Sequence, residues 1–447
     1  MTSAPTPPRV YFRTLGCAKN QVDSEVMLGQ LALAGCAIAE DLADADVAIV
    51  NTCSFIASAR EESVEAILEL AEERERGALG ALVVAGCLPQ RYGQELAREL
   101  PEVDAFVGTG QFQNIARILE EARSGRSKGG VYVDAGRTHL YDEHSPRLLV
   151  GGRHSAYLKI AEGCDRVCAF CAIPGIRGRF QSRTLDSVVA EARMLAAQGV
   201  RELNVISQDT LSWAKDLDGR PRVPELVRAL DEVEGVDWVR LLYLYPSALG
   251  DELLDALAAA KRVLPYLDVP LQHASDRILR AMKRGVTAER QRKLVERARA
   301  RLPGAALRTT FIVGFPGETD EDFAELLAFV REVRFDRVGV FRYSDEEGTS
   351  AHALAGKVPR AVARRRHREL MAVQREIMRE KLAAQVGETA QVLVDSGGRD
   401  RAVGRLWSQA PEVDGTVLLR GGARAGELLR ARLTGVRDVD LEAERAD

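Results

Sequence analysis

Three cysteines lie within eight residues of one another in the segment GCDRVCAFCAIPGIRGRFQSR, residues 163–183. Cys164, Cys168 and Cys171 have the spacing C-x-x-x-C-x-x-C, so one loop can wrap a compact metal centre, and thiolates favour zinc or an iron–sulfur cluster. A closed zinc site takes four protein ligands, and the nearest candidate, His154, is expected to be a surface histidine. The spacing therefore favours an iron–sulfur cluster with one iron left open to a small molecule.

Three of the four upstream cysteines occupy equivalent positions. Cys17 follows VYFRTLG, Cys53 follows DVAIVNT and Cys87 follows ALVVAG, so each lies just past a predicted strand. The carboxyl ends of parallel strands share the edge at which α/β sheets bind ligands, and we expect these three thiols to converge there. A single cysteine is more often a small buried hydrophobe. That interpretation is kept for Cys36, which is predicted to lie inside an apolar helix.

The alternation of apolar strands with helical segments predicts an α/β protein of three domains. Residues 9–124 are predicted to form a parallel βαβ domain of Rossmann-like type, and residues 125–149 a linker rich in Gly, Ser, Arg and His. Six strand-like segments within residues 150–379 predict a partial TIM-type barrel with functional loops at the carboxyl ends of its strands. Short strands and Gly-rich turns in residues 381–447 predict a small antiparallel β-barrel.

Net charge, apolar runs and the number of cysteines limit the classes of function that the chain can have. The net charge is −4 over 447 residues, so the chain lacks the basic excess typical of nucleic-acid-binding proteins. It begins MTSAPTPPRVYF, without the apolar core of a signal peptide, and has no run of about 18 apolar residues. We therefore expect a cytoplasmic protein without a membrane span. Thiols stay reduced in that compartment, so seven cysteines indicate metal binding or catalysis rather than disulfides.

The spacing of the cysteine triad, its position after a strand and the barrel that follows resemble the radical S-adenosylmethionine superfamily. The resemblance implies that Cys164, Cys168 and Cys171 bind a 4Fe-4S cluster, whose open iron is chelated by the methionine amino and carboxylate groups of S-adenosylmethionine. Reductive cleavage then yields a 5′-deoxyadenosyl radical. In such enzymes the cofactors carry the difficult chemistry, and the protein contributes orientation and exclusion of water.

A radical triad preceded by three further strand-end cysteines resembles the methylthiotransferases, over nearly the whole chain. The resemblance implies that Cys17, Cys53 and Cys87 hold a second 4Fe-4S cluster involved in sulfur delivery. It also implies that the C-terminal barrel is a TRAM domain that engages the substrate. The implied partners are an electron donor such as flavodoxin or ferredoxin, and a sulfur source.

Two branches of this family differ in substrate. TLGCAKNQVDSE, NTCSFIASAREES, DVPLQHASDRILRAMKRG and TTFIVGFPGET resemble the RimO branch, which modifies an aspartate of small-subunit ribosomal protein twelve (uS12). Ala18 stands where a proline is commoner in that branch. The resemblance implies insertion of a methylthio group at the aspartate β-carbon, with S-adenosylmethionine as both methyl donor and radical source. One alternative is MiaB-like methylthiolation of a tRNA adenosine, a branch whose sequences typically carry a GCQMN-type start. The other is a non-catalytic iron–sulfur electron carrier or scaffold.

Three further segments end predicted strands and are expected to face S-adenosylmethionine: VISQDT, PLQHAS and TTFIVGFPGETDEDF. Their candidate residues are Ser207, Gln208, Gln272, His273, Gly314, Gly317 and Glu318. A purely structural turn is an equal alternative for GFPGET, and a satisfied polar residue at the barrel mouth is one for His273. Thr319 and Asp322 have the spacing of a helix-capping box, with Asp in place of the usual Glu or Gln.

The net charge of the C-terminal barrel indicates what kind of partner it can bind. Residues 381–447 carry 10 Lys and Arg against 11 Asp and Glu, so they lack the basic excess that grips an RNA backbone. A basic protein, such as a ribosomal one, is the more compatible partner. The arginines of residues 364–368 are expected to form a solvated helix face.

Overall fold

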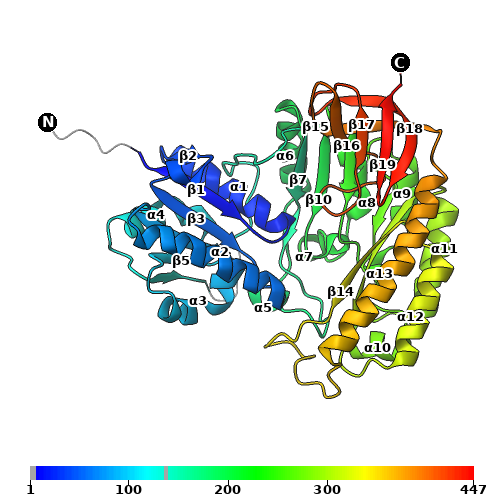
Figure 1. The fold of residues 1–447 in the computed structure, drawn as a ribbon, viewed down its shortest axis with the longest axis horizontal. Coiled ribbons are helices and arrows are strands. Elements are labelled where there is room, and N and C mark those ends of the chain that lie inside the picture. The colour runs from blue at the N-terminus through cyan, green and yellow to red at the C-terminus, as the bar shows by residue number, and fades with distance from the viewer. Residues whose placement is uncertain (1–6, 135–138, 447) are drawn as a thin grey trace.

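The computed structural model describes residues 7–134 and 139–446, which form three units in chain order (Figure 1). An α/β unit in blue and cyan is followed by a larger α/β unit in green and yellow, and a small β-barrel in red lies against the larger unit. The predicted fold class is confirmed. None of the helices in these ranges combines the length and the apolar character that a bilayer span requires.

The N-terminal unit is a parallel sheet with the strand order β2-β1-β3-β4-β5-β6. Its strands are β1 (Arg9–Thr14), β2 (Ala37–Ala39), β3 (Val47–Thr52), β4 (Ala81–Gly86), β5 (Ala105–Val107) and β6 (Gly130–Tyr132). Its helices are α1 (Ala18–Leu33), α2 (Ala57–Glu75), α3 (Cys87–Glu99) and α4 (Ile115–Arg123). Every residue of β3 and β4 is buried, because α1 and α4 cover one face of the sheet and α2 and α3 the other.

Two local features of this unit differ from the prediction. β6 lies inside residues 125–149, the predicted linker, and pairs in parallel with β5, so the sheet continues past the predicted boundary. Its three half-buried residues are too few to give a periodic signal. Helix α1 ends at Leu33 and Gly35 turns the chain with a φ of 87°, so Cys36 follows the helix instead of lying inside it. Cys36 packs, half-buried, against the apolar core.

The central unit is a partial barrel of parallel strands. These are β7 (Ser155–Lys159), β10 (Glu202–Ile206), β11 (Trp238–Leu241), β12 (Tyr266–Asp268), β13 (Ala306–Val313) and β14 (Arg337–Arg342), which coincide with the six predicted segments. They form two three-stranded sheets, β11-β10-β7 and β12-β13-β14. The sheets are linked where the Leu244 amide donates to the Asp268 carbonyl over 2.8 Å. The short strands β8 (Ala161–Glu162) and β9 (Gln181–Ser182) pair antiparallel on either side of the cysteine triad.

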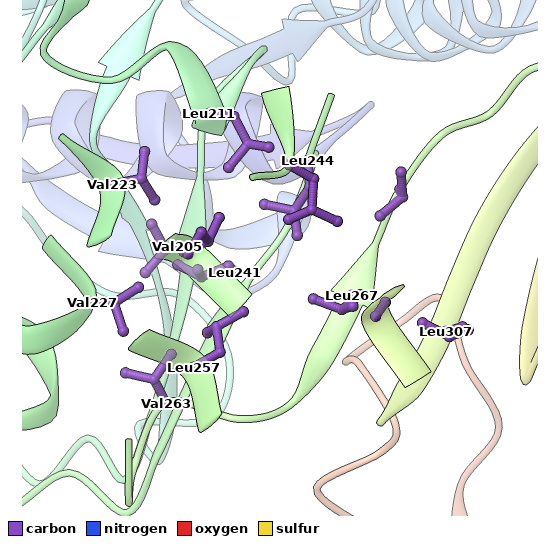
Figure 2. Close-up of a cluster of buried hydrophobic side chains, with 14 of the residues drawn as sticks. Val205, Leu211, Val223, Val227, Leu241, Leu244, Leu257, Val263, Leu267 and Leu307 are labelled. Carbon is purple, nitrogen blue, oxygen red and sulfur yellow. The ribbon is translucent and has the colours of Figure 1, made fainter. Parts of the chain in front are cut away.

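Helices of this unit cover the outside of these strands, apart from the short helix at residues 173–177, which contacts α3 of the N-terminal unit (Figure 1). They are α5 (Ile173–Arg177), α6 (Leu185–Ala197), α7 (Lys215–Asp218), α8 (Val223–Asp231), α9 (Asp251–Ala259), α10 (Asp276–Ala281), α11 (Ala288–Arg301), α12 (Asp320–Val333) and α13 (Arg360–Ala383). Figure 2 shows part of the apolar core, to which one sheet contributes Val205 and Leu241 and the other Leu267 and Leu307. Burial of this shared core holds both sheets together and so fixes where their carboxyl ends lie.

The C-terminal unit is a closed barrel in the order β15-β16-β17-β19-β18. Its strands are β15 (Thr389–Ser396), β16 (Arg401–Arg405), β17 (Val417–Arg420), β18 (Leu428–Arg437) and β19 (Asp440–Arg445). β19 was not among the predicted strands. It pairs antiparallel with β18 but parallel with β17, so the predicted antiparallel barrel has one parallel pair. Along β18 buried Leu429 and Leu433 alternate with exposed arginines, the period of a strand with one face in a core.

Two residues expected on the surface are buried. His154 is 7% exposed, and its Nε2 lies 3.0 Å from Oδ1 of Asp395 in β15, so it joins the C-terminal barrel to the central unit. Arg366 of α13 is 3% exposed, with its guanidinium 3.1 Å from Oε1 of Glu318 and 2.9 Å from Oδ1 of Asp320. The predicted solvated face was therefore wrong at that position, because α13 packs against the start of α12.

Candidate functional site

The upstream cysteines lie where β1, β3 and β4 end. Cys17 precedes the first turn of α1, Cys53 directly follows β3, and Cys87 opens α3. Gly16 has a φ of 97°, and a Cβ added to it would lie 2.8 Å from the Cβ of Cys53. Only glycine lets the Cys17 loop approach Cys53 so closely. The three cysteines are therefore neighbours at one edge of the sheet.

The buried thiols of Cys53 and Cys87 are hard to deprotonate without a neighbouring cation. Burial raises the pKa of Cys87 to about 12 and also raises that of Cys53, and neighbouring thiols add to both shifts. Arg177 opposes this effect at Cys87, since its Nη2 donates to the Sγ atom over 3.4 Å. Metal coordination deprotonates a thiol, so an iron centre would supply the positive charge that favours the thiolates.

The cysteine triad lies in the loop between β8 and α5. The Cys171 amide donates to the Cys168 carbonyl over 3.1 Å in a tight turn. Nη1 of Arg284 donates to the Sγ of Cys168 over 3.2 Å, and the Arg166 amide donates to the Sγ of Cys164 over 3.4 Å. Burial raises the pKa of Cys164 to about 11 and that of Cys171 to about 12. N–H groups therefore already point at two of the three sulfurs, an arrangement that tunes cluster thiolates.

The donor set distinguishes between kinds of metal centre. Among residues 7–134 and 139–446, no three His, Cys, Asp or Glu side chains are arranged to hold a single metal ion. A 4Fe-4S cluster makes a different demand, because each thiolate binds a separate iron. A closed zinc site at the triad would need a fourth ligand, and the candidate His154 is bound to Asp395 instead. The two sets of three thiols therefore fit iron–sulfur clusters better than zinc.

A network of buried charges connects the two sets of cysteines. Helix α5 begins two residues after Cys171 and ends on Arg177, which is 2% exposed and reaches Cys87. Nη1 of Arg177 also lies 2.7 Å from Oδ2 of Asp23 and 3.0 Å from Oε2 of Glu162. One five-residue helix thus carries the chain from one set of thiols to the other.

Lys159 completes this network. Its Nζ lies 2.5 Å from Oδ1 of Asp23 and 2.8 Å from Oε2 of Glu162. Burial alone would raise the pKa of Glu162, but Arg177 and Lys159 hold it at about 2. Two cations thus pair with two carboxylates, and this pairing offsets the cost of burying them. Sequence reasoning missed these residues, because an ion pair between distant segments leaves no periodic pattern.

Within the residues that the structure describes, three of the predicted cofactor residues retain a polar atom with neither a hydrogen bond nor an ion pair, whereas Oε1 of Glu318 lacks a hydrogen bond but is paired with Arg366. Oε1 of Gln208, Oε1 of Gln272 and Nε2 of His273 are buried and have no hydrogen-bond partner within the described parts of the chain. Gln208 is anchored through its Nε2, which donates to Oε1 of Glu162 over 2.5 Å. Gln272 has a φ of 74°, and both its backbone N–H and its backbone C=O form hydrogen bonds with β13. Buried polar atoms without partners need a water, an ion or a ligand to satisfy them.

The other predicted cofactor residues bond to other groups of the protein. The Ser207 hydroxyl lies 3.3 Å from the hydroxyl of Thr210. Oε2 of Glu318 accepts the amides of Gly314 and the residue after it. Gly314 has a φ of 78°, and a Cβ added to it would lie 2.6 Å from the Cβ of Ala363 in α13. Close packing of α13 is thus sufficient reason for glycine at position 314.

The GFPGET turn leads into α12. Gly317 has a φ of 82°, and its amide donates to the Gly356 carbonyl over 2.8 Å. Thr319 and Asp322 form the predicted capping box, in which Oγ1 of Thr319 accepts the Asp322 amide and Oδ2 of Asp322 accepts the Thr319 amide. Burial raises the pKa of Glu318 to about 7, against the opposing effect of Arg366. These contacts are those of a structural turn.

Comparisons with known protein families give three matches along the chain. Residues 9–108 match the uncharacterized protein family UPF0004, residues 158–330 the radical SAM superfamily, and residues 386–445 the TRAM domain. The three matched segments fall in the three units of the fold.

Curated relatives extend over nearly the whole chain. Ribosomal protein uS12 methylthiotransferase RimO of Anaeromyxobacter sp. (strain K) is 50% identical over 437 residues, which are 97% of this chain and 92% of the relative. The protein of the same name from Myxococcus xanthus (strain DK1622) is 46% identical over 449 residues, 99% of this chain and 93% of the relative.

A similar solved structure is the radical S-adenosylmethionine methyltransferase TsrM from Kitasatospora setae, with cobalamin and a [4Fe-4S] cluster bound. The TM-score is 0.53 with 18% sequence identity, and the match covers 75% of each chain. At that identity the likeness concerns the fold alone.

Proposed function

The chain belongs to the RimO family of ribosomal protein uS12 methylthiotransferases, and we propose that it places the methylthio group on the β-carbon of an aspartate of uS12. It is a radical S-adenosylmethionine enzyme, with 4Fe-4S clusters and S-adenosylmethionine as its cofactors. The observation that carries the proposal is the presence of two sets of three cysteines, connected through Arg177.

The two sets of cysteines have different roles. Cys164, Cys168 and Cys171 hold the cluster that binds S-adenosylmethionine, and Cys17, Cys53 and Cys87 hold the auxiliary cluster from which sulfur is delivered. When bound, S-adenosylmethionine and its cluster supply the one-electron chemistry that removes hydrogen from an unactivated C–H bond, which no side-chain base does at a useful rate. Arg284 and Arg177 each donate to a sulfur of one set and hold it in orientation.

The cofactor pocket is assembled from strand-end loops of the barrel. Gln208, Gln272 and His273 offer their unpartnered polar atoms to S-adenosylmethionine. Ser207, Gly314, Gly317 and Glu318 belong to the same site and shape its loops, because their polar groups bond to other groups of the protein. The neutral, buried ring of His273 also helps to exclude water.

The remaining partners follow from the chemistry. Reduction of the radical cluster needs an electron donor such as flavodoxin or ferredoxin, and each turnover needs a source of sulfur. The substrate-binding TRAM barrel has nearly balanced charge, which suits a basic ribosomal protein better than an RNA backbone. We place the reaction in the cytoplasm, where uS12 is made and assembled.

The proposal is tested by separating cleavage of S-adenosylmethionine from methylthiolation. Alanine variants of Cys17, Cys53 or Cys87 should still release 5′-deoxyadenosine under anaerobic, reducing conditions but give no methylthiolated uS12 by mass spectrometry. Alanine variants of the triad should lose both products. Cys36→Ala is the matched control, because Cys36 packs against the core and belongs to neither set, and it should retain both.

Normal methylthiolation by a Cys17, Cys53 or Cys87 variant would contradict the assigned role of the N-terminal unit. A deletion strain settles the substrate. Its uS12 should lack the mass of the methylthio group, whereas loss of methylthio-adenosine from tRNA would favour the MiaB-like alternative. A protein that releases no 5′-deoxyadenosine at all would be an electron carrier or scaffold.

A further inference from the structure

Lys19 stands where the N-terminal unit meets the barrel. It occupies the first turn of α1, two residues after Cys17, and its side chain is 6% exposed. Its Nζ lies 3.0 Å from the centroid of the Tyr243 ring. Tyr243 follows β11 at the carboxyl end of the barrel, and its amide donates to Oδ2 of Asp268 over 2.9 Å. The ammonium group is therefore placed between the auxiliary cysteines and the barrel mouth.

The charge of Lys19 has no carboxylate partner in the described parts of the chain. The acidic residues around this part of the structure are paired with other groups. Asp23 and Glu162 belong to the buried network of the two cysteine sets, and Oδ1 of Asp268 accepts from Arg308 over 2.7 Å. A buried charge without a partner is costly, so this place favours an anion from outside the chain.

The start of α1 also favours binding of an anion. This 16-residue helix has no side-chain cap and no acidic residue in its first turn. Its free amides give the N-terminus a partial positive charge, and Lys19 adds a full one. The Cys17 thiolate of a loaded cluster is one anion that meets this charge, and the experiment below separates that role from the binding of a second anion.

The substrate has a matching group. In the proposed reaction the reacting β-carbon of the aspartate is bonded directly to its carboxylate carbon. A cation that holds the carboxylate therefore fixes the β-carbon one bond away, next to the auxiliary cysteines and at the barrel mouth. We infer that Lys19, supported by the Tyr243 ring, binds the carboxylate of the target aspartate. This inference rests on the proposed function and adds a substrate-binding residue to it.

The test measures binding without turnover. Reconstituted enzyme, with S-adenosylmethionine but no reductant, is titrated calorimetrically with uS12 and with uS12 that carries Asn at the target position. Wild type is expected to bind the Asp form about tenfold more tightly, because the amide forfeits a charge-assisted hydrogen bond. Lys19→Met should bring the ratio close to one, and Lys19→Arg should keep most of it. Contacts elsewhere on uS12 cancel in the ratio.

Lys293→Met, on the exposed side of α11, is the control and should keep the wild-type ratio. Visible absorbance of the clusters and substrate-independent release of 5′-deoxyadenosine report that Lys19→Met folds and loads. Equal weakening of both forms would mean that Lys19 only neutralises the Cys17 thiolate, and would overturn the inference. A preserved Asp preference in Lys19→Met, or a wild-type ratio near one, would overturn it as well. The proposed function fails separately, if wild type with reductant does not methylthiolate uS12.

Discussion

Individual buried groups set the chemistry at the barrel mouth, and His273 is the clearest of them. It is 0% exposed, and its Nδ1 accepts the Ser275 amide over 3.0 Å, so the ring proton lies on Nε2. Burial lowers the pKa of His273 to about 3. The ring therefore stays neutral near pH 7 and can donate a hydrogen bond from Nε2 to a bound cofactor.

His273 should make stability depend on pH. Its folded pKa of about 3 lies below the ordinary value of 6.5, so below pH 6.5 the unfolded chain binds a proton that the folded chain does not. The stabilisation is complete above pH 6.5 and is lost as the pH falls towards 3. Between about pH 7 and 5.5, wild type should lose about 1 kcal/mol more unfolding free energy than His273→Gln.

Urea unfolding measures this difference through the fluorescence of Trp213 and Trp238, which are both buried in the central unit. Other groups that titrate in the same range contribute equally to wild type and variant. Parallel losses in the two proteins would therefore show that His273 is not the source of the pH dependence.

At the scale of elements, α12 determines the shape of the GFPGET loop. Its capping box fixes Thr319 and Asp322 to each other, and Oδ1 of Asp322 also accepts the Ser275 hydroxyl over 2.6 Å. One helix start thereby connects the loop after β13 to the PLQHAS loop, which carries Gln272 and His273. Loss of the cap hydrogen bond should therefore alter the shape of the cofactor pocket, although the substituted residue is not one of those that bind the cofactor.

Thr319→Ala should cost about 1 kcal/mol of stability, the usual value of an N-cap hydrogen bond. Thr287 caps α11 in the same way, accepting the Arg290 amide over 3.3 Å, but lies outside the predicted cofactor loops. Thr287→Ala should therefore cost a similar amount. Only Thr319→Ala should also weaken binding of S-adenosylmethionine, by up to about fivefold if the whole loss reaches the pocket. Calorimetric titration of both reconstituted variants checks this, and equal affinities would contradict the connection.

At the scale of the whole molecule, buried ion pairs attach the TRAM barrel to the central unit. Arg405 of β16 is 2% exposed, and its Nη2 lies 2.7 Å from Oε2 of Glu202 in β10. Arg240 of β11 reaches the other oxygen of Glu202 over 3.0 Å. Burial alone would raise the pKa of Glu202, but these two arginines hold it at about 2. The carboxylate is thus shared between the two units.

Arg405→Met should destabilise attachment of the TRAM barrel by about 3 kcal/mol, because it leaves a buried carboxylate with one of its cations missing. Limited proteolysis should then cut residues 384–388, the connection between α13 and β15, faster than in wild type. Arg445→Met removes an exposed pair with Glu427 in the same barrel and should change the rate little. Equal cleavage of all three proteins would show that the apolar contacts suffice for docking.

Local patterns were enough to predict most of the elements. The six strands of the partial barrel, the capping box at Thr319 and the strand-end positions of Cys17, Cys53 and Cys87 all come from residues close together in the sequence. Where the local signal was weak the prediction failed, as at the three-residue strand β6, the closing strand β19, and Cys36 beyond Gly35. His154 and Arg366 were placed on the surface because their partners, Asp395 and Glu318, are far away along the chain.

The sequence by itself determined the fold class, the two sets of cysteines and the family, because hydrophobic period, turn residues and cysteine spacing are local properties of the chain. Only the tertiary structure decided which charges meet. Arg177 reaches Cys87, Lys159 reaches Asp23, and Lys19 lies over Tyr243 with no carboxylate of its own among the described residues. Electrostatic contacts depend on distances in space between segments far apart in sequence, and those distances exist only once the apolar cores have packed.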